Sequence, residues 1–421
     1  MLNRFSQRIE SRRESARRSR IANLEGNCFV LTGATGALGA HLLIQICNLP
    51  SVEKVICLCR AKSLEEAEQR VEESLRKRKL GTEKSLADLE VSTNTKILCL
   101  ASDLNKTDLG LNPKQGFLDE ILNEATHIVH NAWPVNFSMG IAAFETSLNG
   151  LINLLNLCAF SYRQSPPTFT FCSSIASIAK IEPNSETNKI MERISNDPRH
   201  ASHMGYGRSK WIAETLCEKA SKRIKGLRCM IARIGQLACD TNAGVWNEKE
   251  AWPALLKTAQ ILGCLPDLRS KPLRWLPIDT AACLIVAATM TISDRNYSLK
   301  ENIFKIVHVV NPHSTGWINV IEAMRQSRIT FRIVPLETWV KMLANGKEQD
   351  PFVNPAIKLL SFYNSWTENT GKESEMDIRR LQDVLKERPD LMDRLRPISI
   401  VVLMKTIEAW RASGFFADQR D

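Results

Sequence analysis

The stretch that decides the fold runs from Cys28 to Gly39 and reads CFVLTGATGALG. Its first part is a short apolar run typical of a buried strand, and its last part opens a helix. Glycines three residues apart between them let the backbone turn tightly and approach a pyrophosphate, which the amides of the helix N-terminus then face. The stretch therefore predicts a dinucleotide-binding turn. The residues expected to contact the dinucleotide are Thr32, Gly33, Thr35, Gly36, Ala37, Leu38 and Gly39.

Short apolar runs continue to alternate with amphipathic stretches along the chain, which indicates βαβ units and a doubly wound parallel sheet of the Rossmann type. The candidate strands are Cys28–Leu31, Val55–Leu58, Lys96–Leu100, His127–His130, Thr168–Cys172, Arg228–Ala232 and Ile306–Val310. The alternation loosens after Ile234, and the chain reads mainly helical from Trp317, including one stretch from Val384 to Trp410. We therefore expect an α/β protein with an interleaved, mostly helical C-terminal substrate domain.

The expected boundaries follow from these patterns. Residues 1–25 form a basic lead-in, residues 26–236 the dinucleotide-binding domain and residues 237–421 the substrate-binding domain. A part near 275–312 is expected to return to the sheet, because it contains the last candidate strand.

Composition limits the class of protein. A hydrophobic content of 44% with 24% charged residues is typical of a folded globular chain. The longest apolar stretch, Ala281–Met290, is too short to cross a bilayer, and no signal-peptide core precedes it. Twelve scattered cysteines are best interpreted as reduced thiols. We therefore expect a cytoplasmic protein without a membrane partner. Because no CxxC or HExxH motif is present, we expect no metal site.

The net charge of +10 is unevenly placed, since the first twenty residues carry seven arginines against two glutamates. A mitochondrial presequence and a basic arm for nucleic acid both fit this composition. A solvated lead-in helix or linker fits it as well, and we prefer that interpretation. The remaining positive charge is diffuse, so no nucleic-acid partner is expected.

The strand Val55–Leu58 leads into Arg60, about 20 residues past the glycines, where an acidic residue would bind the ribose 2′-hydroxyl of NAD. A guanidinium instead suits a 2′-phosphate, so the sequence predicts NADPH. Arg70, on the following helix, is a second candidate, although an exposed helix arginine is the alternative.

Two further strand ends supply cofactor candidates. Asp103 and Leu104 follow the third strand, where a carboxylate can accept a hydrogen bond from the adenine amino group. Asn131 and Ala132 follow the fourth strand and are expected to line the path toward the nicotinamide.

A candidate catalytic set lies further along the chain. Tyr206 and Lys210 are four residues apart, hence on one face of a helix, and a nearby ammonium favours the phenolate. Upstream, a strand ends in Ser173 and Ser174, hydroxyls that can bond the same substrate oxygen as the tyrosine. We choose Ser174 because alternation turns its neighbour the other way, and Ser173 remains the alternative.

Together these residues resemble the extended short-chain dehydrogenase/reductase family. More narrowly, the chain resembles the thioester reductase domains of nonribosomal peptide synthetases, polyketide synthase hybrids and carboxylic acid reductases, especially fungal ones. The segments that carry the resemblance are Leu31–Gly39, His130–Phe137, Arg233–Gln236, Gly244–Asn247 with Trp252 and Pro253, and Leu262–Pro266.

The resemblance implies reductive release, with NADPH, of an acyl chain held as a thioester on a carrier protein's phosphopantetheine arm. In such a reaction Tyr206 and Ser174 would stabilise the oxyanion, Lys210 would hold the nicotinamide ribose, and the product would be an aldehyde or, after a second reduction, an alcohol. The product would belong to secondary metabolism.

Three alternatives stay open at this stage. No carrier motif precedes Gly26, so the chain is either a free-standing reductase or an excised domain. The substrate is either an acyl thioester, carrier- or CoA-bound, or a free small-molecule carbonyl, as in an extended-family dehydrogenase or aldehyde reductase. A sensor that binds NADP without turnover would need no catalytic hydroxyl, tyrosine and lysine.

Overall fold

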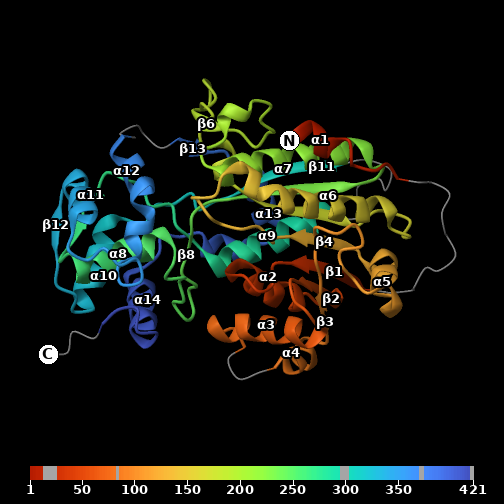
Figure 1. The fold of residues 1–421 in the computed structure, drawn as a ribbon, viewed down its shortest axis with the longest axis horizontal. Coiled ribbons are helices and arrows are strands. Elements are labelled where there is room, and N and C mark those ends of the chain that lie inside the picture. Colours follow the sequence, from red (N-terminus) through yellow and green to blue (C-terminus); the bar gives the residue numbers. More distant parts are fainter. Residues whose placement is uncertain (13–25, 82–84, 294–302, 369–373, 418–421) are drawn as a thin grey trace. The chain divides into compact units, whose positions relative to one another are not determined.

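Seven parallel strands form the central sheet of the protein (Figure 1). The computed structural model describes residues 1–12, 26–81, 85–293, 303–368 and 374–417. The sheet has the order β11-β7-β5-β4-β1-β2-β3, in which the direction of succession reverses beside β1. The strands are β1 (Asn27–Thr32), β2 (Val52–Cys59), β3 (Lys96–Ala101), β4 (His127–His130), β5 (Thr168–Ser174), β7 (Arg228–Ile234) and β11 (Ile303–Val309). The seven predicted strands and the Rossmann-type sheet are thus confirmed.

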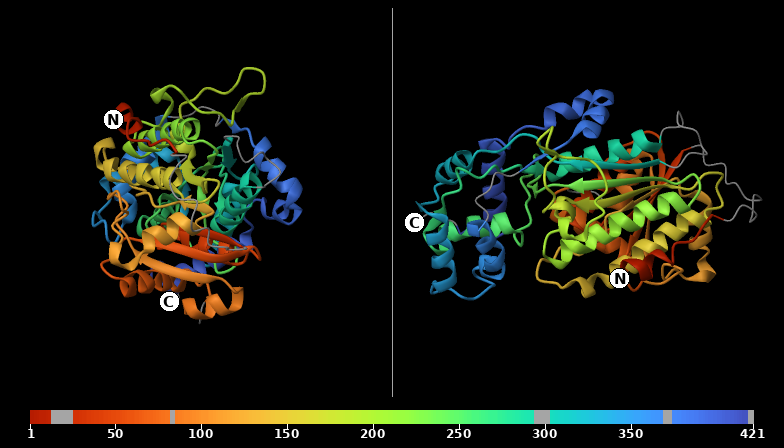
Figure 2. Two further views of the ribbon diagram at one scale, coloured as in Figure 1. Left: turned by 90° about the vertical axis from the view of Figure 1, so that its right-hand side faces the viewer. Right: turned by 90° about the horizontal axis from the view of Figure 1, so that it is seen from above.

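Helices pack on both faces of this sheet (Figures 1 and 2). Alternate residues of β5 show which helices cover which face. Phe169 and Phe171 belong to the same hydrophobic cluster as leucines of α6 and α7, whereas the hydroxyl of Thr170 lies 2.9 Å from that of Thr289 on α9. The helices concerned are α2 (Ala37–Cys47), α3 (Leu64–Lys77), α4 (Leu86–Thr93), α5 (Phe117–Glu124), α6 (Glu145–Phe160), α7 (Gly205–Arg223) and α9 (Ile278–Ser293).

The chain forms two compact units. The first consists of Met1–Gly235, Asp279–Val310 and Glu375–Asp393, and the second of Gln236–Ile278, Asn311–Ser374 and Arg394–Asp421. The first unit therefore includes one segment, Glu375–Asp393, that we expected in the C-terminal domain. Its elements are the short strand β13 (Glu375–Met376), which pairs with β6 (Lys189–Ile190), and the helix α13 (Arg379–Glu387).

Side chains of Arg380, in the segment Glu375–Asp393, and of Glu192 cover β11, the strand at one edge of the sheet. Arg380 Nη1 donates to the carbonyl of Ile306 over 2.9 Å and to that of Glu192 over 2.8 Å. The carboxylate of Glu192 in turn accepts the amides of His308 and Arg380, each over 2.9 Å. Since β11 is an edge strand, these contacts satisfy backbone groups that no neighbouring strand can reach.

The first twelve residues also differ from the expected solvated lead-in. Phe5 on α1 (Leu2–Ser6) and Ile9 are almost wholly buried in the core of the first unit. The side chain of Asn156 on α6 accepts the amide of Glu10 over 2.9 Å and donates to the carbonyl of Arg8 over 3.0 Å. This part of the chain is therefore packed along α6. The rest of the predicted lead-in, residues 13–25 with most of its arginines, lies outside the described residues.

The second unit is mostly helical and has its own core. Its elements are α8 (Ala251–Ile261), α10 (Trp317–Gln326), α11 (Leu336–Asn345), α12 (Leu360–Glu368), α14 (Ile400–Ala412) and the short strands β8 (Leu237–Ala238), β9 (Cys264–Pro266), β10 (Leu276–Pro277) and β12 (Arg332–Val334). The stretch from Val384 to Trp410, expected to be mainly helical, contains the end of α13 (Arg379–Glu387) and most of α14, and prolines at 389 and 397 lie between them. Trp246 and Trp252 are buried in this core.

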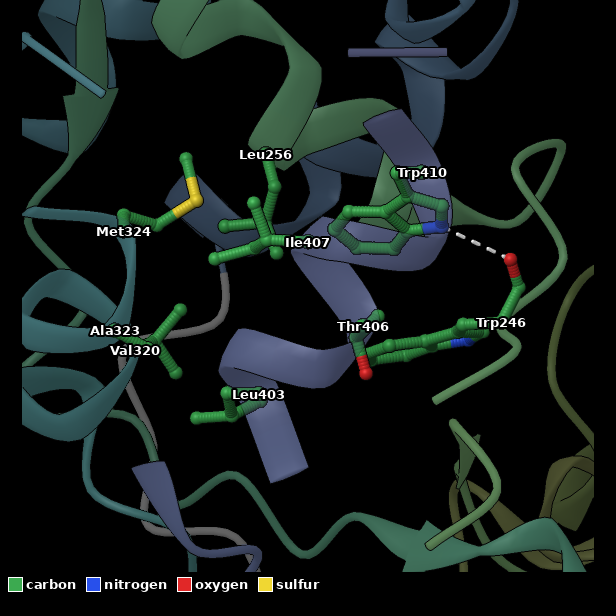
Figure 3. Close-up of a pocket in the computed structure, with 9 residues that line it drawn as sticks. All are labelled: Trp246, Leu256, Val320, Ala323, Met324, Leu403, Thr406, Ile407 and Trp410. Atoms are coloured by element: carbon green, nitrogen blue, oxygen red, sulfur yellow. Dashed lines mark hydrogen bonds between the residues drawn. The ribbon is translucent and has the colours of Figure 1, made fainter. Parts of the chain in front are cut away.

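A small apolar pocket lies within the second unit, lined mainly by α10 and α14 (Figure 3). The polar groups of its lining are already engaged: Trp410 Nε1 donates to the carbonyl of Trp246 over 3.0 Å, and the hydroxyl of Thr406 donates to the carbonyl of Val402. The pocket therefore offers no polar side chain to orient a ligand, and we regard it as part of the packed core. Among the described residues, no helix combines the length and apolar content that crossing a bilayer needs.

Candidate active site

The loop between β1 and α2 is shaped by its glycines. Gly33 has a φ of +79°, and a Cβ there would lie 2.8 Å from the backbone nitrogen of Ala132. At Gly39 a Cβ would lie 1.8 Å from the carbonyl oxygen of Gly33. Gly36 is the N-cap of α2, and no side chain caps this helix. The loop thus leaves the first amides of α2 for an anion, an arrangement that fits the pyrophosphate of a dinucleotide.

The other loop residues differ in exposure. Thr35 and Ala37 are partly exposed where the loop enters α2, whereas Leu38 is buried. The first two can present side-chain atoms to a ligand, and Leu38 can present only its backbone.

Thr32 joins the glycine loop to the end of β4. Its hydroxyl accepts the amides of Asn131 and Ala132, each over 3.1 Å, and lies 2.8 Å from His130 Nδ1. Because the hydroxyl already accepts two hydrogen bonds, its single proton is donated to His130, whose own proton is then on Nε2. Burial lowers the pKa of His130 to about 3, so this arrangement persists at neutral pH. The predicted cofactor residues Asn131 and Ala132 are therefore held directly beside Gly33.

Arg60 and Arg70 lie together beyond the end of β2. Arg60 is exposed, and Arg70 Nη1 donates to the Arg60 carbonyl. The exposed Arg60 and the guanidinium of Arg70 therefore lie just beyond the strand that follows the glycine loop, at the position where the sequence predicts the ribose 2′-substituent.

The remaining predicted cofactor residues follow β3. Asp103 is exposed, and its carboxylate accepts the amide of Asn105 over 3.1 Å, so the turn orients it. Leu104 packs against the core, and its carbonyl accepts a hydrogen bond from Asn153 on α6 over 2.8 Å. Of the two, only Asp103 has a side chain exposed to a ligand.

Ser174 and Tyr206 are brought together at the carboxyl end of the sheet. Ser174 ends β5, where its hydroxyl accepts the amide of Ala176 over 3.2 Å, and it lies close enough to the phenol of Tyr206, in the first turn of α7, to lower the pKa of that phenol. Ser173 faces the other way and donates to Glu214 over 2.6 Å. The geometry thus favours Ser174 as the partner of the tyrosine.

Burial determines the protonation of the tyrosine. Its pKa is raised to about 12 by burial, and Ser174 lowers it only in part. The sequence predicts the opposite, a phenol whose pKa the nearby lysine lowers. In the structure the removal of water determines the direction of the shift, so Tyr206 is a hydrogen-bond donor at neutral pH.

Lys210 is wholly enclosed one turn further along α7. Its Nζ donates to the carbonyl of Cys172 over 2.6 Å and lies 4.6 Å from the ring centroids of both Trp133 and Phe171. Burial lowers the pKa of Lys210 to about 7, while the rings favour its charged form. Sequence reasoning missed this aromatic enclosure, because Trp133 lies in the loop after β4, Phe171 on β5 and the lysine itself on α7.

Glu214 is a further residue that sequence reasoning missed. It lies four residues after Lys210 on α7, is fully buried and forms an ion pair with Arg233 of β7. A carboxylate at this helical spacing from the candidate lysine was the signal that could have identified it. Within the described residues, no group of histidines, cysteines and carboxylates is arranged to hold a metal ion.

A glycine-rich turn on a Rossmann sheet, followed by a serine, a tyrosine and a lysine at these positions, defines a nicotinamide-dependent oxidoreductase of the extended short-chain dehydrogenase/reductase type. The chain belongs to the NAD-binding family described as male sterility protein, whose model matches residues 31–285.

Two curated reductases are similar to most of this chain. A carboxylic acid reductase of Neurospora crassa is 31% identical over 86% of this chain and 33% of its own length. An adenylate-forming reductase, Nps10, of Heterobasidion annosum is 32% identical over 80% of this chain and 29% of its own length. The chain thus spans about a third or less of the curated relatives it matches.

Solved structures support the fold. The terminal R domain of the myxalamid PKS-NRPS pathway superposes with a TM-score of 0.76, at 22% identity, over 99% of both chains. A reductase domain of a nonribosomal peptide synthetase from Mycobacterium tuberculosis gives 0.72 at 19% identity, over 99% of this chain and 96% of that one. The same fold thus extends over both units of the chain.

Proposed function

We propose that the protein reduces an acyl thioester to an aldehyde with NADPH. The observation that carries the proposal is that Ser174 at the end of β5 and Tyr206 in the first turn of α7 lie close together, at the carboxyl ends of the strands, where the glycine loop also lies. Relatives described as carboxylic acid reductase and adenylate-forming reductase support it.

The chemistry assigned to each side chain follows from its environment. A bound nicotinamide supplies a hydride to the thioester carbonyl carbon. Tyr206, which stays protonated because its pKa is near 12, donates to the oxygen on which negative charge develops, and Ser174 provides the second donor. When the tetrahedral adduct collapses, the C–S bond breaks and the sulfur leaves as a thiol. One thioester, one NADPH and one proton give one aldehyde, one thiol and NADP⁺.

The preference for NADPH rests on Arg60 and Arg70. Both arginines lie beyond β2, and a 2′-phosphate is the charged group that distinguishes the two dinucleotides. We expect Arg60→Ala to weaken NADPH binding by roughly 10- to 100-fold while it leaves NADH binding nearly unchanged, because one charge-assisted hydrogen bond contributes about 1.5–3 kcal/mol. Equal losses for both cofactors would contradict this preference.

The acyl donor is proposed to be a phosphopantetheinyl carrier protein, and the second unit is proposed to bind its acyl chain. Support comes from relatives described as polyketide synthases, among them sor2 of Hypocrea jecorina, which is 29% identical over 93% of this chain and 15% of its own length. A product of secondary metabolism fits the same relatives. The twelve buried cysteines suit a reducing compartment, which supports a cytoplasmic location.

The test is NADPH oxidation by the purified chain with an acyl pantetheine thioester, and in parallel with the matching aldehyde. We expect oxidation with the thioester and formation of an aldehyde or alcohol. Tyr206→Phe should abolish turnover and leave NADPH binding nearly unchanged, since the phenol bonds the substrate oxygen. Turnover with the aldehyde alone would instead identify a carbonyl reductase. If NADPH bound but neither compound were reduced, the protein would either require its substrate on a carrier protein or be a sensor that binds NADP without turnover.

A further inference from the structure

One carboxylate lies at the centre of a polar network inside the first unit. Glu214 and Arg233 are both wholly buried. Arg233 Nε lies 3.1 Å from each carboxylate oxygen, and Nη2 donates to Oε2 over 2.7 Å. A buried ion pair is seldom the most stable filling for a core, because removing two charges from water costs about as much as their attraction returns. We therefore look for the role of the Glu214–Arg233 ion pair in what it holds in place, not in its contribution to stability.

The same carboxylate bonds the residues on either side of Ser174. Ser173 donates to Glu214 Oε1 over 2.6 Å, and the hydroxyl of Ser177 lies 2.7 Å from the same oxygen. The Ser177 hydroxyl also lies 2.8 Å from the carbonyl oxygen of Ser174. Because the Ser177 hydroxyl has a single proton, it donates to only one of these two acceptors at a time. The strand end that carries Ser174 is thus fixed chiefly through the preceding side chain, that of Ser173.

Glu214 also fixes the helix that carries the other two catalytic candidates. Tyr206, Lys210 and Glu214 recur every four residues of α7 and so share one face of the helix. The carboxylate consequently connects α7 to the end of β5 and to β7. Any rotation of α7 that moved Lys210 would have to break the hydrogen bonds of Glu214.

The far side of the network admits only one arrangement of protons. Arg233 Nη1 lies 3.4 Å from His308 Nε2, and His308 Nδ1 lies 2.8 Å from the carbonyl of Asp377. Since an arginine only donates and a carbonyl only accepts, His308 must accept at Nε2 and donate at Nδ1. Burial and Arg233 together lower the pKa of His308 to about 4, so the imidazole is neutral at pH 7.

We propose that Glu214, held by Arg233, is a positioning residue that fixes Ser174 and Lys210 for the reaction. The expected effect on kcat rests on the proposed function. The expected effect on the pKa of Lys210 does not, because the carboxylate favours the charged form of this lysine whether or not a substrate is present. The other titratable groups that face the lysine are Cys172 on β5, Cys217 on α7, His130 on β4 and Tyr206.

The test compares Glu214→Gln with Glu192→Gln. Glu192 is a matched control: it is a buried carboxylate of the same unit and accepts two backbone amides, but it contacts neither Ser174 nor Lys210. We expect Glu214→Gln to lower kcat by about 10- to 100-fold, because small misplacements of reacting groups have effects of this size. KM for NADPH should stay within about twofold, and Glu192→Gln should leave kcat unchanged. Equal losses of kcat in the two variants would overturn the proposal.

A second readout does not depend on turnover. The titration of Lys210 can be followed by NMR on ¹⁵N-lysine-labelled protein, with Lys210→Arg to assign the signal. Glu214→Gln should move this titration to lower pH, and Glu192→Gln should not. A variant Ser173→Ala keeps the carboxylate charge, so it should lower kcat without moving the titration. An unmoved titration in folded Glu214→Gln would overturn the proposal even if the wild-type chain reduced no thioester, a result that would refute only the proposed function.

Discussion

Gly39 shows how a single hydrogen atom in place of a methyl group shapes the cofactor loop. A Cβ at this position would lie 1.8 Å from the carbonyl oxygen of Gly33 and 2.5 Å from its carbonyl carbon. Both atoms are backbone, so no side-chain rotation can make room. The helix α2 packs against the loop only because this residue has no side chain.

We therefore predict that Gly39→Ala displaces the loop from α2 and weakens NADPH binding by roughly tenfold or more, measured by fluorescence titration. Gly140→Ala is the control, because its φ is not positive and a Cβ there meets no atom within 4 Å. Unchanged NADPH affinity in Gly39→Ala would show that the missing side chain at position 39 does not determine the shape of the loop.

For single residues, the sequence predicted the direction of a side chain better than its pKa or its surroundings. Strand alternation correctly separated the directions of Ser173 and Ser174, because that alternation is a local property of β5. The high pKa of Tyr206 and the enclosure of Lys210 depend on rings and backbone from distant segments, which no local pattern contains. Whether the candidate site residues act as proposed remains a prediction.

At the scale of elements, the N-terminal segment is the one whose role differs most from expectation. Its arginines suggested a solvated lead-in, but Phe5 and Ile9 occupy the core beside α6 and α7. The sequence contained the signal, an apolar residue four positions before another, within a stretch dominated by charge. The helix is five residues long, too short to be recognised by periodicity.

We predict that Phe5→Ala destabilises the first unit by about 3–5 kcal/mol, the usual cost of removing a buried phenyl ring. The measurement is urea unfolding followed by fluorescence. Arg4→Ala is the control: its exposed ion pair with Glu145 should contribute no more than about 1 kcal/mol. If the two variants unfolded at the same urea concentration, the segment would not be part of the core.

The strands of the sheet could be predicted from local sequence patterns, whereas the return of the segment Glu375–Asp393 to the first unit could not. Most strands of the sheet contain a short, mainly apolar run, since parallel strands are buried on both faces. The segment Glu375–Asp393 joins the first unit through a two-residue strand, through polar side chains such as Arg380, and through the buried face of α13. That face predicts a helix, but it does not indicate that the helix packs against β11.

At the scale of the whole molecule, three buried histidines connect stability to pH. Burial lowers the pKa of His127 and His130 to about 3 and that of His308 to about 4, from an ordinary value of 6.5. The unfolded chain therefore binds protons that the folded chain does not, so their contribution is complete above pH 6.5 and is lost as the pH falls toward 3. Glu192 and Glu250, whose pKa values burial raises to about 6 and about 7 from an ordinary 4.5, act in the opposite direction between pH 4.5 and 7, but they are two groups against three.

We predict that the free energy of unfolding falls steadily below pH 6.5. His127→Phe should flatten this dependence by one proton, or about 1.4 kcal/mol per pH unit, because a phenyl ring can still stack on Phe29 but cannot titrate. The exposed His203 provides the control, since His203→Asn should leave the slope unchanged. A slope that His127→Phe does not alter would show that this imidazole titrates normally in the folded chain.

We propose that the chain transfers a hydride to a thioester carbonyl with the aid of Ser174 and Tyr206. The most direct measurement uses NADPH deuterated at C4 of the nicotinamide, an acyl pantetheine thioester and mass spectrometry of the released product. We predict one deuterium at the former carbonyl carbon of the aldehyde, or two if reduction continues to the alcohol, together with one free thiol for each acyl group. In Tyr206→Phe, neither the label nor the thiol should appear. Release of the thiol with an unlabelled acyl product would contradict the claim, because it would mean that the site cleaves the thioester without reducing it.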